Sequence, residues 1–77
     1  MTVGPNLEKN GVIVVETEDD SKLISGDIII EINREPITTI DNFFEVVEKV
    51  KKTGRNSLLL KIIRDEKSLW VTIKFHQ

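Results

Sequence analysis

The 77-residue sequence contains no cysteine and no tyrosine, and it has only one histidine and two prolines. Without cysteine the chain can form neither disulfides nor thiolate metal sites. No apolar run approaches the roughly 20 residues of a membrane-spanning helix. Basic and acidic residues number 11 and 13, and their interleaving leaves no basic surface of the kind that binds nucleic acid. We therefore expect neither nucleic-acid binding nor membrane insertion.

Residues suited to catalysis are also scarce. His76, the one histidine, lies next to the C-terminal residue, where chains fray. The serines lack the Gly-x-Ser-x-Gly pattern of a hydrolase nucleophile and have no second histidine to act as base. The acidic stretch 16–20 lacks the spacing and the glycine of a calcium-binding loop, which favours a solvated turn. We expect this chain not to be an enzyme and to need no metal or cofactor.

What the sequence does contain is typical of a single small folded domain, residues 1–77. It is 39% hydrophobic and 31% charged, as in ordinary globular proteins. Runs of apolar and β-branched residues predict four main strands, bounded by turn-forming residues. These strands cover residues 11–16, 28–32, 57–64 and 68–75, with a short extended segment at 35–37. A loop is expected at 17–22, and turns at 33–34 and 65–67.

One helix is expected between residues 39 and 54. Thr39 or Asp41 serves as its N-cap, acidic residues come early, lysines come late, and Gly54 follows the end. At roughly 100° per residue, one apolar stripe should face the core. We assign to this stripe Ile40, Phe43, Val47 and Val50, with Val46 at one edge beside Asn42 and Lys49, and Phe44 at the opposite edge.

Four mostly antiparallel strands and one helix predict an α+β fold, a small partly open barrel or sandwich capped by the helix. The strand 28–32 alternates only partially, which predicts burial on both faces or beneath the helix. We expect Ile30 in the core, and Asp27 as a turn residue that accepts hydrogen bonds from nearby amides. Trp70 lies on the other face of its strand from Leu69; it either covers the outside of the sheet or marks a contact surface.

These elements and their motifs resemble a PDZ domain from Met1 to Phe75. The resemblance is carried by Gly-Val-Ile-Val at 11–14 and by Ile-Ser-Gly-Asp-Ile-Ile-Ile-Glu-Ile-Asn-x-x-Pro-Ile at 24–37, followed by a helix and two strands. The order of elements is similar to the circularly permuted bacterial form in HtrA/Do-type serine proteases, especially their second PDZ domain. In that form the peptide-binding strand opens the domain and the last strand completes the sheet.

The sequence departs from the family pattern in three ways. The usual Asn-Gly turn is Asn33-Arg34, so either Arg34 accepts a strained backbone or the turn changes type. The segment between the first main strand and Gly26 is shorter than in the family. The family's hydrophobic-Gly-hydrophobic carboxylate loop falls at or before Met1, because residues 1–5 resemble the stretch that follows that loop. We therefore expect the chain to be a fragment of a larger protein.

The resemblance implies peptide binding. An extended peptide can add a strand to an exposed sheet edge, with its side chains in pockets beside a flanking helix. The resemblance places this edge strand in the N-terminal segment and the groove wall on the helix. The predicted peptide-binding residues are Met1, Thr2, Val3, Gly4, Asn42 and Val46, with Lys49 favouring acidic residues or a terminal carboxylate.

The partners implied are peptides or unfolded protein segments, including C-terminal ones, and neighbouring domains of the parent protein. By resemblance the location is periplasmic or otherwise extracytoplasmic, and the function is regulation of an HtrA/Do-type serine protease. The alternative is a structural PDZ domain that holds together a protease oligomer or a secretion component. Peptide titration, with the free acid compared with the amide, separates these two functions.

Overall fold

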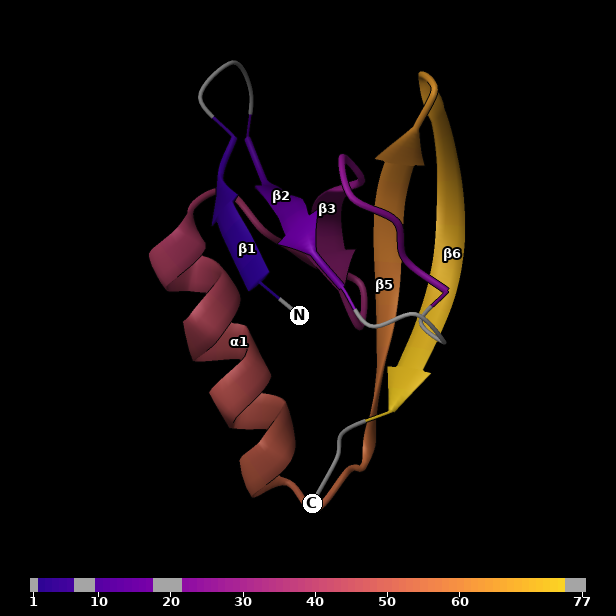
Figure 1. Ribbon diagram of the computed structural model, residues 1–77. Helices are drawn as coiled ribbons and strands as arrows, with labels where there is room; N and C mark the ends of the chain where they lie inside the picture. Colours follow the sequence, from indigo (N-terminus) through magenta and orange to yellow (C-terminus); the bar gives the residue numbers. More distant parts are fainter. Residues whose placement is uncertain (1, 7–9, 18–21, 75–77) are drawn as a thin grey trace.

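The computed structural model describes residues 2–6, 10–17 and 22–74. In these residues one helix packs beside a six-stranded antiparallel sheet that does not close on itself (Figure 1). The predicted α+β class and the open antiparallel arrangement are confirmed. The elements are β1 (Thr2–Pro5), β2 (Val12–Glu16), β3 (Ile28–Ile32), β4 (Glu35–Pro36), α1 (Ile40–Lys52), β5 (Ser57–Arg64) and β6 (Lys67–Lys74).

The strands follow the order β1-β2-β3-β5-β6, and the short β4 pairs with β3 outside this path. One side of β3 pairs with β2 at its start and with β4 at its end, while its other side pairs with β5. β3 is therefore the centre of the sheet, as its isoleucine content indicates. β1 and β6 lie at the two ends of the path, where each pairs with one neighbour among the described residues.

A β-bulge explains the irregular alternation of β3. Ile29 pairs with Ile62 of β5, but the next pair is Glu31 with Lys61, so Ile30 is an extra residue in the ladder. A bulge shifts the alternation of side chains by one position. As a result Ile29 and Ile32 are both fully buried, whereas Ile30 is only partly buried. The prediction that Ile30 is a core residue is corrected accordingly.

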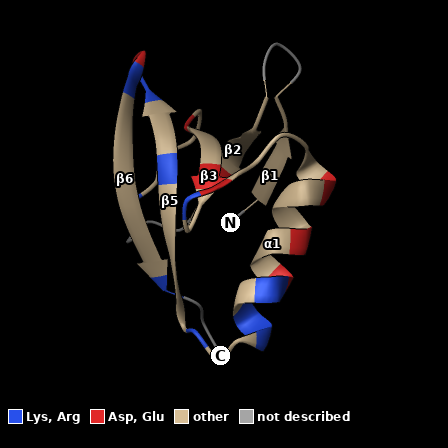
Figure 2. Ribbon diagram, turned by 180° about the vertical axis from the view of Figure 1, so that it is seen from behind, with Lys and Arg blue, Asp and Glu red and all other residues tan. Residues whose placement is uncertain are grey.

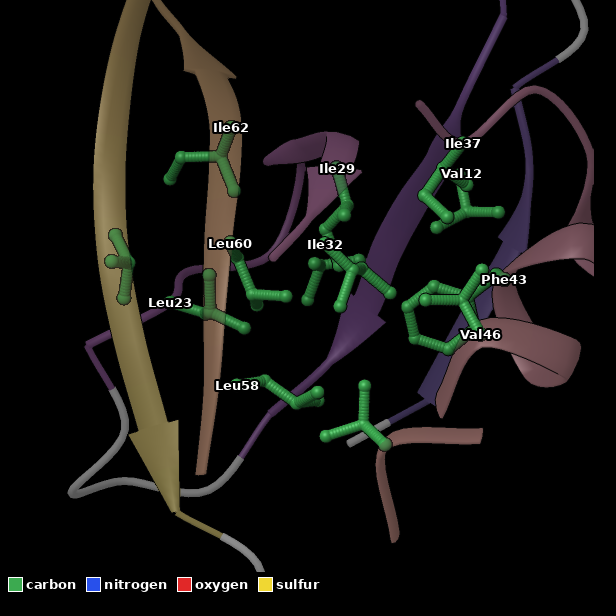
Figure 3. Packing of buried hydrophobic residues seen from close by; sticks show 13 residues of the cluster. Val12, Leu23, Ile29, Ile32, Ile37, Phe43, Val46, Leu58, Leu60 and Ile62 are labelled. Carbon is green, nitrogen blue, oxygen red and sulfur yellow. The ribbon is translucent and has the colours of Figure 1, made fainter. Parts of the chain in front are cut away.

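The core lies between α1 and the sheet. Figure 3 shows Phe43 and Val46 of the helix pointing toward Ile32 and the other apolar residues of the strands. Val46 is only 6% exposed, so it is a core residue and does not lie at the edge of the apolar stripe. Ile40 and Val47, which we expected in the core, are partly buried at its margin. The helix is thus rotated toward Val46 relative to the expectation. The buried helix residues are Phe43, Val46 and Val50.

A threonine side chain caps the N-terminus of α1, and a glycine follows its C-terminus. Thr39, one of the two predicted N-caps, accepts a hydrogen bond at Oγ1 from the amide of Asn42, at 3.1 Å. Gly54 follows the helix at φ +82° and donates to the carbonyl of Lys51, as a glycine just beyond a helix often does. The helix boundaries predicted from the sequence are confirmed.

The turn after β3 keeps the tight geometry of a two-residue hairpin. Asn33 and Arg34 have φ values of 49° and 70°, so Arg34 adopts the left-handed backbone that the family pattern assigns to glycine. Asn33 supports this conformation, because its Oδ1 accepts from the amide of Leu59 at 2.9 Å. Asp65 and Glu66, between β5 and β6, form a second turn with positive φ at both residues.

Candidate functional site

The edge strand β1 contains three of the predicted site residues. Thr2 is exposed, Val3 is half-buried against the core, and Gly4 is half-buried. All three pair with β2, opposite Glu16, Val14 and Ile13, and the register shifts between Thr2 and Val3. Met1, also predicted to bind, lies outside the described residues. The structure thus presents a short edge with one side paired to β2 and the other side unpaired among the described residues.

The helix α1 lies beside this edge and contacts both β1 and β3 (Figure 1). Val46 points into the core between them, so any influence on a ligand would act through packing rather than through an exposed surface. An edge strand next to a helix is the geometry that strand addition requires. The neighbourhood predicted from the sequence therefore exists, although Val46 does not form an exposed wall.

Asn42 and Lys49 lie on the β4 side of α1. Lys49 Nζ is 2.9 Å from Glu35 Oε1 on β4, and Asn42 Oδ1 accepts from the amide of Thr38, which follows β4. In Figure 1, β1 lies in front of the segment that joins β3 to α1; in Figure 2, seen from behind, that segment lies in front of β1. The same segment reaches the residue before β2, because the carbonyl of Thr38 accepts from the amide of Gly11 at 3.2 Å. Asn42 and Lys49 are thus engaged by Thr38 and by Glu35 of β4, and their contact with a ligand stays a prediction.

The opposite flank of α1 is apolar. Ile40 and Val47 are seven residues apart and lie on one side of the helix, as do Asn42 and Lys49 on the other. Ile40 and Val47 pack at the margin of the core. Phe44 follows on the same flank, is 53% exposed, and contacts Phe43 edge to face, with 5.3 Å between ring centroids. The sequence placed Phe44 at one edge of the apolar stripe, and the side chain is exposed in the structure.

A buried ion pair holds the glycine turn before β3. Asp27 is 1% exposed; its Oδ2 accepts from the amide of Ile24 at 2.9 Å and from Arg64 Nη2 at 2.6 Å. Its Oδ1 accepts from Arg64 Nε at 2.9 Å. Gly26, at φ +98°, provides the backbone conformation of the turn and donates to the carbonyl of Val14. The predicted hydrogen bond from a nearby amide to Asp27 is confirmed.

The electrostatics of this pair follow from its contacts. Burial alone would raise the pKa of Asp27, but the hydrogen bonds from Arg64 and Ile24 and the charge of Arg64 together hold that pKa below its ordinary value. The hydrogen bond to Asp27 in turn raises the pKa of Arg64. The carboxylate is thus ionised at neutral pH, its oxygens are hydrogen-bonded, and it stabilises the turn.

Arg64 was not identified from the sequence. It lies 37 residues from Asp27, and it also donates to the carbonyl of Lys22 at 3.1 Å. The available signal was the requirement that a buried carboxylate has a cation as partner. Arg64 is the last residue of β5. The residue before it, Ile63, pairs with Ile28 at the start of β3, next to Asp27.

Two further properties bear on function. Within residues 2–6, 10–17 and 22–74, no group of three or more His, Cys, Asp or Glu side chains is arranged to hold a metal ion. No helix in this part of the chain is long and apolar enough to cross a membrane. His76 and most of the acidic stretch 16–20 lie outside the described residues.

Sequence comparison finds similarity to proteins described as serine endoproteases. No family model matches the chain. The chain is similar over its full length to proteins described as "Probable periplasmic serine endoprotease DegP-like" from Brucella suis biovar 1 (strain 1330) and Brucella abortus (strain 2308). Each is 27% identical over 82 aligned residues. The chain spans 16% of the length of these relatives, so the similarity covers one segment of each of them.

Proposed function

We propose that the chain is a PDZ-type peptide-binding module of a periplasmic HtrA-type serine protease, and that it binds extended segments by strand addition at β1. The similarity to DegP-like endoproteases over the whole chain supports the parent class. The observation that carries the binding role is the outer edge of β1 beside α1, which is unpaired within the described part of the chain. The backbone groups of that edge can hydrogen-bond to an added strand, and the helix can contact its side chains.

The wall of the groove has two candidate positions on α1. The sequence and the resemblance favour Asn42, Val46 and Lys49. The contacts favour the other flank, with Val47 and the exposed Phe44, since Lys49 is already paired with Glu35 of β4. We place the ligand side chains against Val47 and Phe44. The apolar character of this flank makes hydrophobic peptide residues its best partners.

The experiment is a titration of 15N-labelled domain with a hydrophobic C-terminal peptide, as free acid and as amide. We expect affinities of about micromolar, because the interface is small and the peptide must be ordered. Amide shifts should fall in residues 2–4 and 40–51. A preference for the free acid identifies C-termini as ligands, and equal binding identifies internal segments. Shifts that spare residues 2–4 contradict the proposal.

Two matched variants distinguish the two flanks. Val47→Ala should weaken peptide binding several-fold, while Lys49→Ala, on the β4 side, should leave it unchanged. The reverse result would assign the groove to the flank with Asn42 and Lys49. Circular dichroism of both variants checks that the fold is retained.

A further inference from the structure

The outer face of the sheet, on the side away from the core, contains several large apolar side chains. Residues that pair directly in an antiparallel ladder share a face. Ile13 of β2, Ile28 of β3 and Ile63 of β5 pair in this way, and all three are only half-buried. Gly4 pairs with Ile13, and a Cβ added to Gly4 would lie 3.6 Å from Val15 Cγ2, so Val15 shares this face; it is 47% exposed. An apolar surface that crosses several strands is typical of a protein contact.

A second row on the same face reads apolar, acidic, basic, apolar. Pro36 of β4 pairs with Glu31 of β3, Glu31 with Lys61 of β5, and Lys61 with Trp70 of β6. Lys61 Nζ lies 3.5 Å from Glu31 Oε2 and 5.5 Å from the centroid of the Trp70 ring. Pro36 is exposed, and Trp70 is 50% exposed. The row thus has two opposite charges at its centre and an exposed apolar residue at each end.

The order of this row is self-complementary. Two sheets can pack face to face with their strands roughly aligned. A two-fold axis along the strands, midway between β3 and β5, sets each row against its own copy in reverse order. Glu31 then faces Lys61 of the other copy, and Pro36 faces Trp70 of the other copy. In the isoleucine row, Ile28 faces Ile63. The contact therefore joins opposite charges at its centre and apolar residues beside them.

The charge balance favours a second copy as the occupant of this face. The central row contains one acid and one base, so an acidic or a basic partner would match only one of them, whereas a copy matches both. Lys74, on the same face of β6, lies at the end of the strand and outside both rows. The net charge of the chain is only −2, so repulsion between copies is small. One face of so small a domain makes a contact at the low end of interface sizes, and we expect a dissociation constant of about 0.1 mM.

We propose that the outer face of the sheet is a contact between two copies of this domain, related by a two-fold axis between β3 and β5. Glu31 and Lys61 pair across the axis, and Trp70 packs against Pro36. This inference rests on the outer face alone and does not depend on peptide binding at β1. It gives the alternative role, assembly of an oligomer, a definite surface.

The first test is dilution of the unmodified, 15N-labelled domain from about 1 mM to about 10 µM, a range that brackets the expected dissociation constant. Sedimentation equilibrium should show monomers and dimers that exchange with concentration. The fluorescence of Trp70, the only tryptophan, should change over the same range, and the amides of residues 28–31, 59–63 and 68–72 should shift. A domain that stays monomeric at the highest concentration overturns the proposal. Shifts confined to residues 2–4 and 40–51 also overturn it, because they assign self-association to the edge beside α1.

Two charge variants give the second test. Glu31→Lys sets lysine against lysine across the axis, and Lys61→Glu sets glutamate against glutamate. Each variant alone should self-associate at least tenfold more weakly than the wild type, because like charges directly opposite one another repel. An equimolar mixture places the lysines of one variant against the glutamates of the other and should restore the affinity to within about threefold of the wild type. A mixture that associates no better than the separate variants overturns the proposal.

Two apolar substitutions on β6 give the third test. Trp70→Ala should weaken self-association at least fivefold. Leu69→Ala, the next residue along the strand, should leave it within twofold, because Leu69 pairs with the buried Ile62 and therefore points to the other face. Equal effects of the two substitutions would contradict the assigned face. Circular dichroism checks that all four variants keep the fold, and the dilution of the wild type does not depend on any of them.

Discussion

Replacement of Asp27 by asparagine isolates the contribution of the buried ion pair. The side chain keeps its shape, but one carboxylate oxygen becomes an amide that can only donate. Oδ2 accepts from Ile24 and Arg64, so the remaining oxygen is best retained there. The new NH2 group then lies at the Oδ1 position, 2.9 Å from Arg64 Nε, where two donors oppose each other. The variant loses a charged hydrogen bond and leaves Arg64 without its hydrogen-bonded counter-charge, with only the longer-range attraction of Asp65.

We expect Asp27→Asn to lower the free energy of unfolding by about 2–4 kcal/mol at pH 7, from the loss of charged hydrogen bonds in a buried pair. A chain of this length has a total stability of about 4–12 kcal/mol, so the loss is a large share of it. Urea denaturation followed by circular dichroism measures the difference. Asp65→Asn is the matched control for the buried hydrogen bonds. It makes the same chemical change at an exposed turn with φ 51°, which asparagine tolerates well, and it removes only a longer-range attraction to the same Arg64.

The pH dependence gives a second check. The pKa of Asp27 in the folded protein lies below its ordinary value of 3.8, so its stabilising contribution is present above that pH and is lost as pH falls through the folded pKa. Asparagine does not titrate. The stability difference between wild type and Asp27→Asn should therefore hold from pH 7 to pH 5 and narrow below about pH 4. A difference that stays constant down to pH 2, or that equals the difference for Asp65→Asn, would refute this explanation.

Two further pairs of substitutions test the packing. Ile29→Ala should cost about 2–5 kcal/mol because the side chain is fully buried, and Ile30→Ala at the bulge should cost less than half as much; equal urea midpoints would contradict the observed register. Gly11→Ala should destabilise strongly, because its Cβ would lie 2.6 Å from the carbonyl oxygen of Ile29 at φ +105°. Gly26→Ala, with no atom within 4 Å of the new Cβ, should cost only about 1–2 kcal/mol of backbone strain in thermal or urea unfolding; a larger loss than for Gly11→Ala would be inconsistent with the close backbone approach.

The sequence predicts the elements well because their signals are local. The strands 28–32 and 57–64 coincide with β3 and β5. The last strand, predicted at 68–75, begins one residue earlier at Lys67, and the predicted residue 75 lies outside the described residues. β-branched runs and turn residues define such segments without reference to the rest of the chain. The N-cap at Thr39 and Gly54 after the helix belong to the same class of signal.

The features that escaped prediction depend on contacts between distant segments. The bulge at Ile30 is a property of the pairing between β3 and β5, which no periodicity within β3 reveals. The rotation of α1 about its axis decides that Val46, and not Val47, is buried against the sheet. Because the two valines are adjacent, either rotation would present an apolar side chain to the core, so the sequence does not distinguish them. The partner of Asp27 comes from the far end of β5. For the candidate site, the β1 edge beside α1 was anticipated, while contact of any residue with a ligand stays a prediction.

Because the sheet is open, its inner and outer strands should differ in the free energy of local unfolding. β3 and β5 each have neighbours on both sides, so their amides can exchange with solvent only when much of the sheet opens. β1 and β6 are held from one side among the described residues and can detach at a lower free-energy cost. A strand added at either end would turn an outer strand into an inner one. A partner strand bound at an edge would thus slow hydrogen exchange of the amides in that strand. It would also raise the free energy of local unfolding of the strands next to it.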